Sequence, residues 1–512
     1  MLSTRLRTLC ALATLAPITM AGTQVTSAAR TSANSAAGPT LTIAVQNDIA
    51  GWGPDRAQGT YQAWPYVAIY DSLVRCAVSG KLEPGIATSW TFTAHNTVFT
   101  AHIRPGLTFS DGTPVNAAAV QAQFLYNQKS PLGSAGWAGV KIATPDAMTI
   151  VVKLPQPDPA FPLDSLCSGG IASAKYLASG KLNTAPVGSG PYTLDASATT
   201  PGSVYTFVKN PSNWDAKDFP FGTIVMKVIS SPTATINALK TNQIDGAPVP
   251  QNLYNETVAS GLKLVAMPGE TTRLLITDHL GKVVPALGNL DVRRAMNMVF
   301  DKNAIATALY QGHATPTSQI PPPNADGFIK GLKDPYPYNI AAAKALMAKA
   351  GYANGFSVDL PFYANVGMDS LFPVVIQQLG LIKITVHEVT LTGPNAINDL
   401  LSGRYPLLMW PLGNYGNTIY DIKQAILQKS IWNVEHQPDA TIQSLYAKLL
   451  NASGAQYKAD RQAIYRYTID HAWFIPLVYQ NVYFAYNPKT VSIPKVTDYG
   501  DLNPLLWDFM LP

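Results

Sequence analysis

Prolines and glycines interrupt this chain so often that it cannot consist of a few long helices. The 512 residues include 40 prolines and 37 glycines. Proline ends helices and strands, and glycine favours turns. The segments between them read as short strands and short helices in alternation, so we expect a mixed α/β fold. With 47% hydrophobic residues, the chain is long enough for about three domain-sized units.

Residues 96–127 illustrate this alternation. Apolar residues recur at every second position along 99–103, as expected of a strand with one buried face, and turns are expected at Pro105-Gly106 and Asp111-Gly112. Asn116 then precedes an alanine-rich segment and is expected to cap a helix. The segment therefore predicts a strand, turn, strand, turn, helix unit.

The amino-terminal residues have the pattern of a Sec-type signal peptide. Arg5 and Arg7 precede an apolar run over residues 9–21, and small residues follow it up to a cleavage site expected at 26–29. A membrane anchor needs about 20 apolar residues, and this run is shorter and interrupted by threonines. We therefore expect a cleaved signal peptide over residues 1–29.

A lipid anchor is not expected either. Cys10 stands at the start of the apolar run, whereas a lipid-attachment cysteine follows such a run after small residues. Residues 30–40 are of low complexity and are expected to form a disordered leader. We expect the mature chain to lie free in the periplasm or outside the cell.

The charge of the chain is small and dispersed. It has 36 Lys and Arg residues against 31 Asp and Glu residues, a net charge of +5 that is spread along the sequence. There is neither a basic stripe nor a recognisable base-reading motif, so nucleic acid is not an expected partner.

The sequence motifs of enzymes and cofactor sites are incomplete in this chain. Gly188-Ser189-Gly190 lacks the spacing of a nucleophile elbow, and the serine–lysine motif at residues 492–495 contains a proline. His387-Glu388 has no second histidine one turn later, and Gly51-Trp52-Gly53 lacks the third glycine of a dinucleotide loop. We expect no catalysis, no cofactor and no metal site.

Two of the 3 cysteines, Cys76 and Cys167, would remain after cleavage of the signal peptide. In an oxidising compartment such a pair favours a disulfide. The alternative is two buried thiols, because sequence spacing does not show that the two Cα atoms come within bonding range. The cysteines form no zinc-binding motif.

Seven blocks of the sequence follow one another in the order typical of one family. They are KLEPGIATSW, TVFTAHIRPGLTFSDGTPVNAAAV, APVGSGPY, VKNPSNWD, ALKTNQIDGAP, DVRRAMNMVFDKNAI and YNIAAAKALMAKAGYANGF. Over nearly all of its mature length the chain resembles the extracellular solute-binding proteins of family five, the peptide- and nickel-binding components of ABC importers. The resemblance implies a type II, cluster C-like periplasmic-binding-protein fold. Such a fold has two lobes joined by two crossing strands and an extra subdomain in the first lobe.

The resemblance also implies domain boundaries. The first lobe would comprise residues 41–74, 192–278 and the return of the chain at 483–512, with the extra subdomain at 75–191. The second lobe would comprise residues 279–482. Gly188 and Gly190 would be turn residues that need permissive backbone angles.

The stretch PLLMWPLGNYGNTIYD, residues 406–421, lies where peptide-binding members of the family have a Trp-x-x-Asp-Tyr pattern. The aspartate of that pattern pairs with the terminal ammonium of the ligand, and an Asp-Pro pair follows. Trp410 and Tyr415 match with one extra residue between them, while Asn414 and Asn417 stand in place of the two acidic residues. An asparagine oxygen can accept a hydrogen bond from an ammonium but does not neutralise its charge.

Three interpretations of this difference remain open. Another carboxylate, such as Asp421, Asp48 or Asp55, could supply the charge from a shifted position. The ligand could instead lack a free amine, in which case aromatic side chains in the cleft would stack on its flat faces. The loop could also be buried and bind nothing.

The resulting prediction is a receptor for small solutes and not an enzyme. It would capture peptides by hinge closure and deliver them to the permease and ATPase of an ABC importer at the inner membrane, acting as a monomer. The alternatives are a receptor for an uncharged ligand such as an oligosaccharide, and a signalling or cell-wall interaction protein without a permease. The residues expected to bind the ligand come from the loop after the first strand and from the 406–421 stretch: Asn47, Trp52, Tyr61, Trp64, Trp410, Asn414, Tyr415 and Asn417.

Overall fold

The computed structural model describes most of the mature chain, and residues Ala36–Pro512 form one compact unit. The described residues are 38–49, 51–54, 63–77, 81–130, 134–167, 169–181, 184–323, 325–363, 368–392, 396–413, 419, 421–496 and 503–512. The predicted signal peptide, residues 1–29, and most of the predicted leader lie outside them. In the described part of the chain, no helix is long and apolar enough to cross a membrane.

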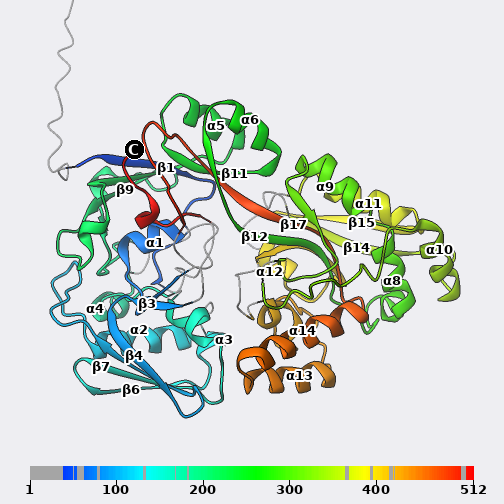
Figure 1. The fold of residues 1–512 in the computed structure, drawn as a ribbon, viewed down its shortest axis with the longest axis horizontal. Helices are drawn as coiled ribbons and strands as arrows, with labels where there is room; N and C mark the ends of the chain where they lie inside the picture. The colour runs from blue at the N-terminus through cyan, green and yellow to red at the C-terminus, as the bar shows by residue number, and fades with distance from the viewer. Residues whose placement is uncertain are drawn as a thin grey trace, which may run out of the picture. The chain divides into compact units, whose positions relative to one another are not determined.

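A mixed β-sheet runs through this unit (Figure 1). Within the described residues its strand order is β16-β12-β17-β11-β1-β10-β9-β8, and β13 pairs with β17. Neighbouring strands are antiparallel, except that β1 runs parallel to β10 and to β11. The strands are β1 Thr40–Val45, β8 Tyr192–Leu194, β9 Val204–Lys209, β10 Thr223–Val228, β11 Gly246–Val249, β12 Lys263–Ile276, β13 Ala314–Pro316, β16 Leu407–Gly413 and β17 Phe474–Tyr486.

Strands β12 and β17 lie side by side and belong to both halves of this sheet (Figure 1). The first part of β12 pairs with the last part of β17 beside β11, whereas the remainder of the two strands pairs beside β16. The pairing shifts between Met267 and Glu270. Gly269 lies in this shift, where a Cβ atom would stand 1.6 Å from the carbonyl oxygen of Gln480. Only glycine fits at this crossing point.

The strands on the β11 side share one hydrophobic core. Leu41 and Ile43 of β1 and Phe207 of β9 are buried in it together with Trp64 and Phe484. A second, smaller cluster packs α5 against β11. The helices of this region are α1 Ala63–Ile69, α5 Pro232–Lys240 and α6 Tyr254–Ala259.

A separate four-stranded antiparallel sheet, in the order β4-β5-β7-β6, carries its own core. Of the strand, turn, strand, turn, helix pattern predicted for residues 96–127, the first strand, both turns and the helix are confirmed, whereas the second strand is wrong, since an isolated bridge between Thr108 and Pro114 stands in its place. Phe99, Ala101 and Ile103 are buried on one face of β5, and Gly112 has a φ of 79°. The Asn116 side chain accepts a hydrogen bond of 3.0 Å from the Ala119 amide and so caps α2. The elements are β2 Val74–Cys76, β3 Leu82–Pro84, β4 Ala87–Thr93, β5 Val98–Ile103, α2 Ala117–Lys129, α3 Ser134–Trp137, β6 Lys141–Asp146, β7 Thr149–Lys153 and α4 Ala174–Ala178.

On the other side of the crossing strands, β16 is buried on both faces. Leu407 and Met409 belong to one hydrophobic cluster, whereas Leu408 and Leu412 belong to another, as the two-residue period of a strand requires. The elements around these clusters are α7 Pro285–Gly288, α8 Leu290–Met298, α9 Lys302–Tyr310, α10 Ile340–Lys349, β14 Phe356–Tyr363, α11 Phe372–Gly380, β15 Ile384–Leu391, α12 Ala396–Leu400, α13 Ala440–Leu450 and α14 Gly454–Asp470. We call the part of the chain around β1 and β5 the first lobe and this part the second lobe. The predicted residue boundaries of the domains stay predictions.

The expected reason for Gly188 and Gly190 is corrected by the structure. Neither residue adopts a positive φ. A Cβ atom at Gly188 would stand 2.0 Å from the carbonyl oxygen of Ile69, and one at Gly190 would stand 2.4 Å from the Ile69 carbonyl carbon. These glycines are therefore required by close packing of two backbones and not by turn geometry.

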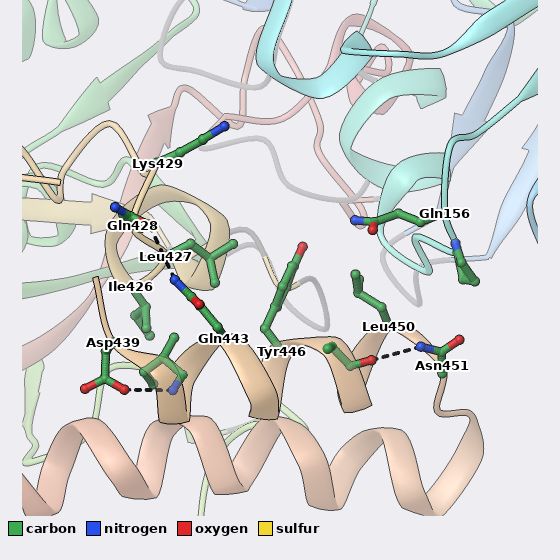
Figure 2. A pocket seen from close by; sticks show the side chains of 13 residues that line it. Gln156, Ile426, Leu427, Gln428, Lys429, Asp439, Gln443, Tyr446, Leu450 and Asn451 are labelled. Carbon is green, nitrogen blue, oxygen red and sulfur yellow. Dashed lines mark hydrogen bonds between the residues drawn. The ribbon is translucent and has the colours of Figure 1, made fainter. Parts of the chain in front are cut away.

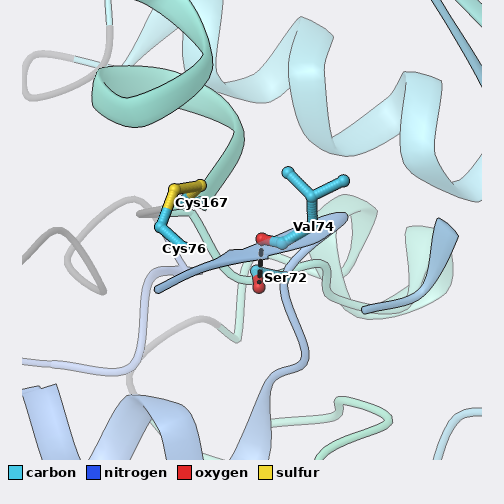
Figure 3. Close-up of a disulfide and its surroundings, with 4 residues drawn as sticks. All are labelled: Ser72, Val74, Cys76 and Cys167. Carbon is cyan, nitrogen blue, oxygen red and sulfur yellow. Dashed lines mark hydrogen bonds between the residues drawn. A yellow bond between two sulfur atoms is a disulfide. The ribbon is translucent and has the colours of Figure 1, made fainter. Parts of the chain in front are cut away.

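Cys76 and Cys167 form a disulfide (Figure 3). Cys76 ends β2, Cys167 ends a π-helical turn at Pro162–Cys167, and their Cα atoms are 5.7 Å apart. The bond joins segments separated by 91 residues in the sequence. It thereby ties the edge of the small β2–β3 hairpin to the chain that follows the four-stranded sheet.

We expect non-reducing peptide mapping of the secreted protein to recover a Cys76–Cys167 crosslink. Replacing both cysteines with alanine should lower the free energy of unfolding by about 2–4 kcal/mol, because the bond restricts the unfolded chain. Denaturant unfolding measures this change. Labelling of both residues as free thiols in the native secreted protein would contradict the prediction.

Candidate functional site

The middle of β16 carries an aromatic stack. Trp410 is half-buried, and its ring centroid lies 4.9 Å from that of Trp432 and 6.2 Å from that of Tyr363. The ring planes are inclined by 32° and 21°, so the three rings lie nearly parallel. Tyr363 ends β14 and is, like Trp432, half-buried. The stack therefore presents flat, partly accessible faces within the 406–421 stretch in which the sequence predicts solute binding.

Four of the predicted binding residues fall where no structure is described. They are Tyr61, Asn414, Tyr415 and Asn417. Their role in binding stays a prediction from the sequence.

Asn47 lies at the edge of the large sheet, on the first-lobe side of the crossing strands. It is exposed and follows β1 by two residues. Because β1, β10 and β11 are parallel, their carboxyl ends meet at this edge, which is where open α/β sheets bind ligands. Gln251, just after β11, donates a 2.7 Å hydrogen bond to the carbonyl of Asn481 on β17. This hydrogen bond joins the segment after β11 directly to β17, one of the two crossing strands.

Trp52 and Trp64 are core residues in this structure. Trp64 is fully buried and donates a hydrogen bond of 2.5 Å from Nε1 to the carbonyl of Pro504. Trp52 is only 5% exposed and makes edge-to-face contacts with three aromatic rings, among them Phe207 at 6.1 Å. Both therefore stabilise the first lobe and turn no face toward a solute, which corrects the expectation that they face the cleft.

Asp421 is committed to a charge network inside the second lobe. Its Oδ1 accepts hydrogen bonds from the Tyr465 hydroxyl at 2.5 Å and from the Ile422 amide at 3.0 Å. Burial raises the pKa of Asp421, and the Tyr465 hydroxyl and the guanidinium groups of Arg273 and Arg461 oppose this rise. Arg273 is fully buried, and its burial lowers its pKa to about 10, against the attraction of Asp421 and Glu270.

Asp421 is thus attracted by two buried guanidinium groups, and Glu270 also attracts Arg273. Leaving one of them without its partner is costly in a buried setting. Asp421 is therefore poorly placed to supply the carboxylate that a solute ammonium would need.

Asp48 is also engaged locally. Its Oδ1 accepts hydrogen bonds from the Tyr205 hydroxyl at 2.5 Å and from the Ile49 amide at 2.8 Å. Asp55, the third carboxylate considered from the sequence, lies outside the described residues. The described alternatives to Asn414 are thus already hydrogen-bonded within the protein.

A hollow of about 360 Å³ lies between the two lobes (Figure 2). Gln156 and Pro157, which follow β7, form one wall, and residues of α13 and of the segment before it form the other. Four carboxamide side chains line it: Gln156, Gln428, Gln443 and Asn451. In Figure 2, Gln156 and the Tyr446 ring approach the hollow from opposite walls. Such a lining offers neutral donors and acceptors beside apolar surface.

Sequence reasoning missed this hollow. The contributing residues on α13 recur at helical spacing, but that spacing alone does not show what the helix faces. Their charged neighbour Asp439 is engaged elsewhere, since it caps α13 through the Ile442 amide and accepts a bond from the Tyr467 hydroxyl at 2.8 Å. Among the residues that the structure describes, no group of three His, Cys, Asp or Glu side chains is placed to hold a metal ion.

The comparison with known families accounts for this arrangement. The family model of bacterial extracellular solute-binding proteins, family 5 Middle, matches residues 81–427. This chain belongs to that family. The resemblance seen in the sequence is confirmed, and the chain is a binding protein rather than an enzyme.

Curated relatives are about a quarter identical to this chain over the part that matches. The glutathione-binding protein GsiB of Escherichia coli O6:K15:H31 (strain 536 / UPEC) is 28% identical over 338 residues, which cover 62% of this chain and 63% of that protein. GsiB of Escherichia coli strain K12 is 27% identical over the same shares. The match spans less than two thirds of the length of these relatives.

Solved structures confirm the two-lobed fold. AgaA of A. tumefaciens R10, in complex with agropinic acid, has a TM-score of 0.81 at 22% identity, covering 92% of this chain and 99% of AgaA. The oligopeptide-binding protein AppA of Bacillus subtilis, in complex with a nonapeptide, has a TM-score of 0.79 at 19% identity, covering 93% and 99%. DppA of Helicobacter pylori, in complex with the peptide STSA, has a TM-score of 0.79 at 20% identity, covering 93% and 98%. At these identities the likeness shows the fold alone.

We expect Asp421→Asn to lower the free energy of unfolding by about 3–5 kcal/mol, because it removes the partner of buried guanidinium groups. Denaturant unfolding without added solute measures the change. Asp48→Asn is the matched control and should cost less than about 1 kcal/mol, since Asp48 is exposed. If Asp421→Asn unfolds like the wild type but no longer binds solute, Asp421 faces the solute after all.

Trp410→Ala should abolish the rise in melting temperature that bound solute produces, because it removes the centre of the aromatic stack. Its effect on the solute-free protein should be smaller than that of Trp473→Ala, for which about 3–5 kcal/mol is expected. Trp473 is only 5% exposed and stacks on His279 at 4.2 Å. Thermal unfolding of both variants with and without solute tests this. If both variants lost the same stability without solute, and solute still raised the melting temperature of Trp410→Ala, Trp410 would be a core residue and not a binding residue.

Proposed function

We propose that this protein captures a peptide-like solute outside the cytoplasm and delivers it to the permease of an ABC importer. The observation that supports this most directly is the hollow of about 360 Å³ whose walls come from both lobes. A solute in such a place contacts both lobes at once. It therefore favours the state in which the lobes approach each other, and the crossing strands β12 and β17 provide the hinge.

Three relatives support a peptide-like solute. GsiB is named for glutathione, and AppA and DppA were solved with a nonapeptide and with the peptide STSA. In our proposal the carboxamides of the hollow exchange hydrogen bonds with the main chain of such a solute. The stack around Trp410 contacts its flat groups.

A second candidate is a solute without a free ammonium, such as an oligosaccharide or another uncharged compound. It is favoured by the charge network around Asp421, which leaves that carboxylate committed to Arg273 and Arg461. Asn414 in the binding loop supports the same candidate, because the corresponding residue in peptide-binding members is an aspartate.

The remaining parts of the proposal concern location and partners. A signal peptide over residues 1–29 would be cleaved on export, and the mature monomer would meet its permease and ATPase at the inner membrane. A role in signalling or in cell-wall interaction, without a permease, is the alternative, and a gene neighbourhood without permease and ATPase genes would support it.

Native mass spectrometry of the secreted protein, purified without denaturation, tests the proposed function. We expect one or more small molecules to be retained, because a receptor that closes over its solute releases it slowly. Calorimetric titration with the peptide Ser-Thr-Ser-Ala and with its N-acetylated form then separates the two candidates. Tighter binding of the free peptide favours an ammonium site supplied from elsewhere, and tighter binding of the acetylated peptide favours the second candidate. The absence of any retained solute, together with no binding of either peptide, would count against a peptide receptor.

A further inference from the structure

A short proline-rich segment of the first lobe reaches into the second lobe. It follows β7 and reads Pro-Gln-Pro-Asp-Pro-Ala over residues 155–160. Gln156 and Pro157 line the hollow between the lobes on its first-lobe side (Figure 2). Ala160 is only 1% exposed and belongs to a hydrophobic cluster whose other buried members lie between Leu275 and Phe474. The segment therefore packs into the core of the opposite lobe.

An ion pair joins the middle of this segment to the second lobe. The Asp158 Oδ2 atom lies 2.8 Å from the Lys423 Nζ atom, and the two side chains are 22% and 24% exposed. The two residues are 265 positions apart in the sequence. Partial burial makes this pair worth more than a fully exposed one, and its remaining exposure leaves it sensitive to screening by salt.

The Asp158 side chain and the backbone of Lys423 are each held by local hydrogen bonds. The other carboxylate oxygen of Asp158 accepts a hydrogen bond of 3.1 Å from the Ala160 amide, and its carbonyl accepts one from the Phe161 amide. Lys423 lies in the π-helical turn Ile422–Ile426, where its carbonyl accepts a 2.7 Å bond from the Ser430 hydroxyl. The Asp158 carboxylate is therefore positioned by its own segment, and the ion pair orders the Lys423 side chain against it.

The prolines stiffen the segment further. Pro155, Pro157 and Pro159 fix the φ angle at every second residue. At the end of the segment, Phe161 is anchored in the first lobe by an edge-to-face contact of 5.2 Å with Trp137. The segment is thus a rigid projection of the first lobe and not a loop that could follow the second lobe if the lobes separated.

A different set of contacts joins the lobes close to the crossing strands. Gln311 donates a 2.9 Å hydrogen bond to the carbonyl of Asn252, and Tyr254 stacks on His313 at 3.7 Å beside Tyr483 of β17. In Figure 1, α6 and α9 adjoin the crossing strands, whereas α3 and α13 lie toward the lower edge of the view. A bend at the crossing strands would therefore separate residues 156–160 from the second lobe.

We propose that residues 156–160 form a clasp that holds the two lobes together, and that the Asp158–Lys423 pair determines how often the clasp is engaged. The clasp engages in the solute-free protein and raises the population of the closed state. Its role in retaining solute rests on the proposed function, because the apparent affinity for a solute scales with the population of the binding-competent state. Its engagement itself needs no solute.

Single-molecule energy transfer between the lobes tests the clasp. Dyes are attached to Lys141→Cys in β6 and Lys448→Cys in α13, two exposed positions in opposite lobes, while the native cysteines of the processed protein are in the disulfide. Retained solute is removed by unfolding in guanidinium with the disulfide intact and refolding. We expect a short-distance population in this protein. Asp158→Lys and Lys423→Asp should each reduce it at least about twofold, and the double variant with exchanged charges should restore it.

Glu256→Lys is the matched control, because the Lys240–Glu256 pair, 2.7 Å apart, lies within the first lobe and its reversal should leave the populations unchanged. Raising the salt concentration should reduce the short-distance population of the unsubstituted chain, which tests the clasp even if a variant does not fold. The proposal would be overturned if no short-distance population were found. It would also be overturned if this population responded neither to charge reversal nor to salt, or if the double variant with exchanged charges did not restore it. None of these results depends on solute binding, so failure of the clasp and failure of the proposed function are distinguishable.

Discussion

The close approach of β12 and β17 at Gly269 is the constraint on which the rest of the molecule depends. A Cβ atom there would collide with the Gln480 carbonyl, so the two backbones can cross only because a glycine separates them. On either side of this shift the two strands continue into separate hydrophobic cores, with a second shift between Thr272 and Arg273. Interdigitated cores resist deformation, whereas bulges bend a strand locally. We therefore expect relative motion of the lobes to be concentrated in this part of the crossing strands.

Several charged side chains of the second lobe are buried close to one another. The buried carboxylates of Asp421 and Glu270 attract the buried guanidinium group of Arg273. The guanidinium group of Arg461 also attracts Asp421. Charges buried in this way must remain paired, because an unpartnered one would cost several kcal/mol. The partly accessible surfaces that remain are the aromatic faces around Trp410 and the lining of the hollow, which combines four carboxamides with Lys429 and Asp439.

The sequence predicted correctly what local chemistry determines. The strand, turn and helix of residues 96–127 follow from a two-residue period, a glycine with positive φ and an asparagine cap, all of which act over a few residues. Gly188 and Gly190 were assigned the wrong cause because the backbone they touch, at Ile69, lies far away in the sequence. Trp52 and Trp64 stand in a loop-rich segment, yet burial depends on Phe207 and Pro504, which no local pattern reveals. The hollow and the network of Asp421 were missed for the same reason.

The sequence could not show the hydrogen bonding of Asp421 or the Asp158–Lys423 ion pair between the lobes. These two features complement each other. A receptor that pairs its solute's ammonium with a carboxylate gains part of its closure energy from that buried ion pair. The sequence predicts Asn414 in the place of that aspartate, and Asp421 is hydrogen-bonded to Tyr465 and attracted by buried guanidinium groups. Closure over a neutral solute then needs another source of stabilisation, and an ion pair between the lobes provides one that does not depend on the charge of the solute. A clasp of this kind would let one groove retain solutes that differ in their ends while they share hydrogen-bonding groups in their middle.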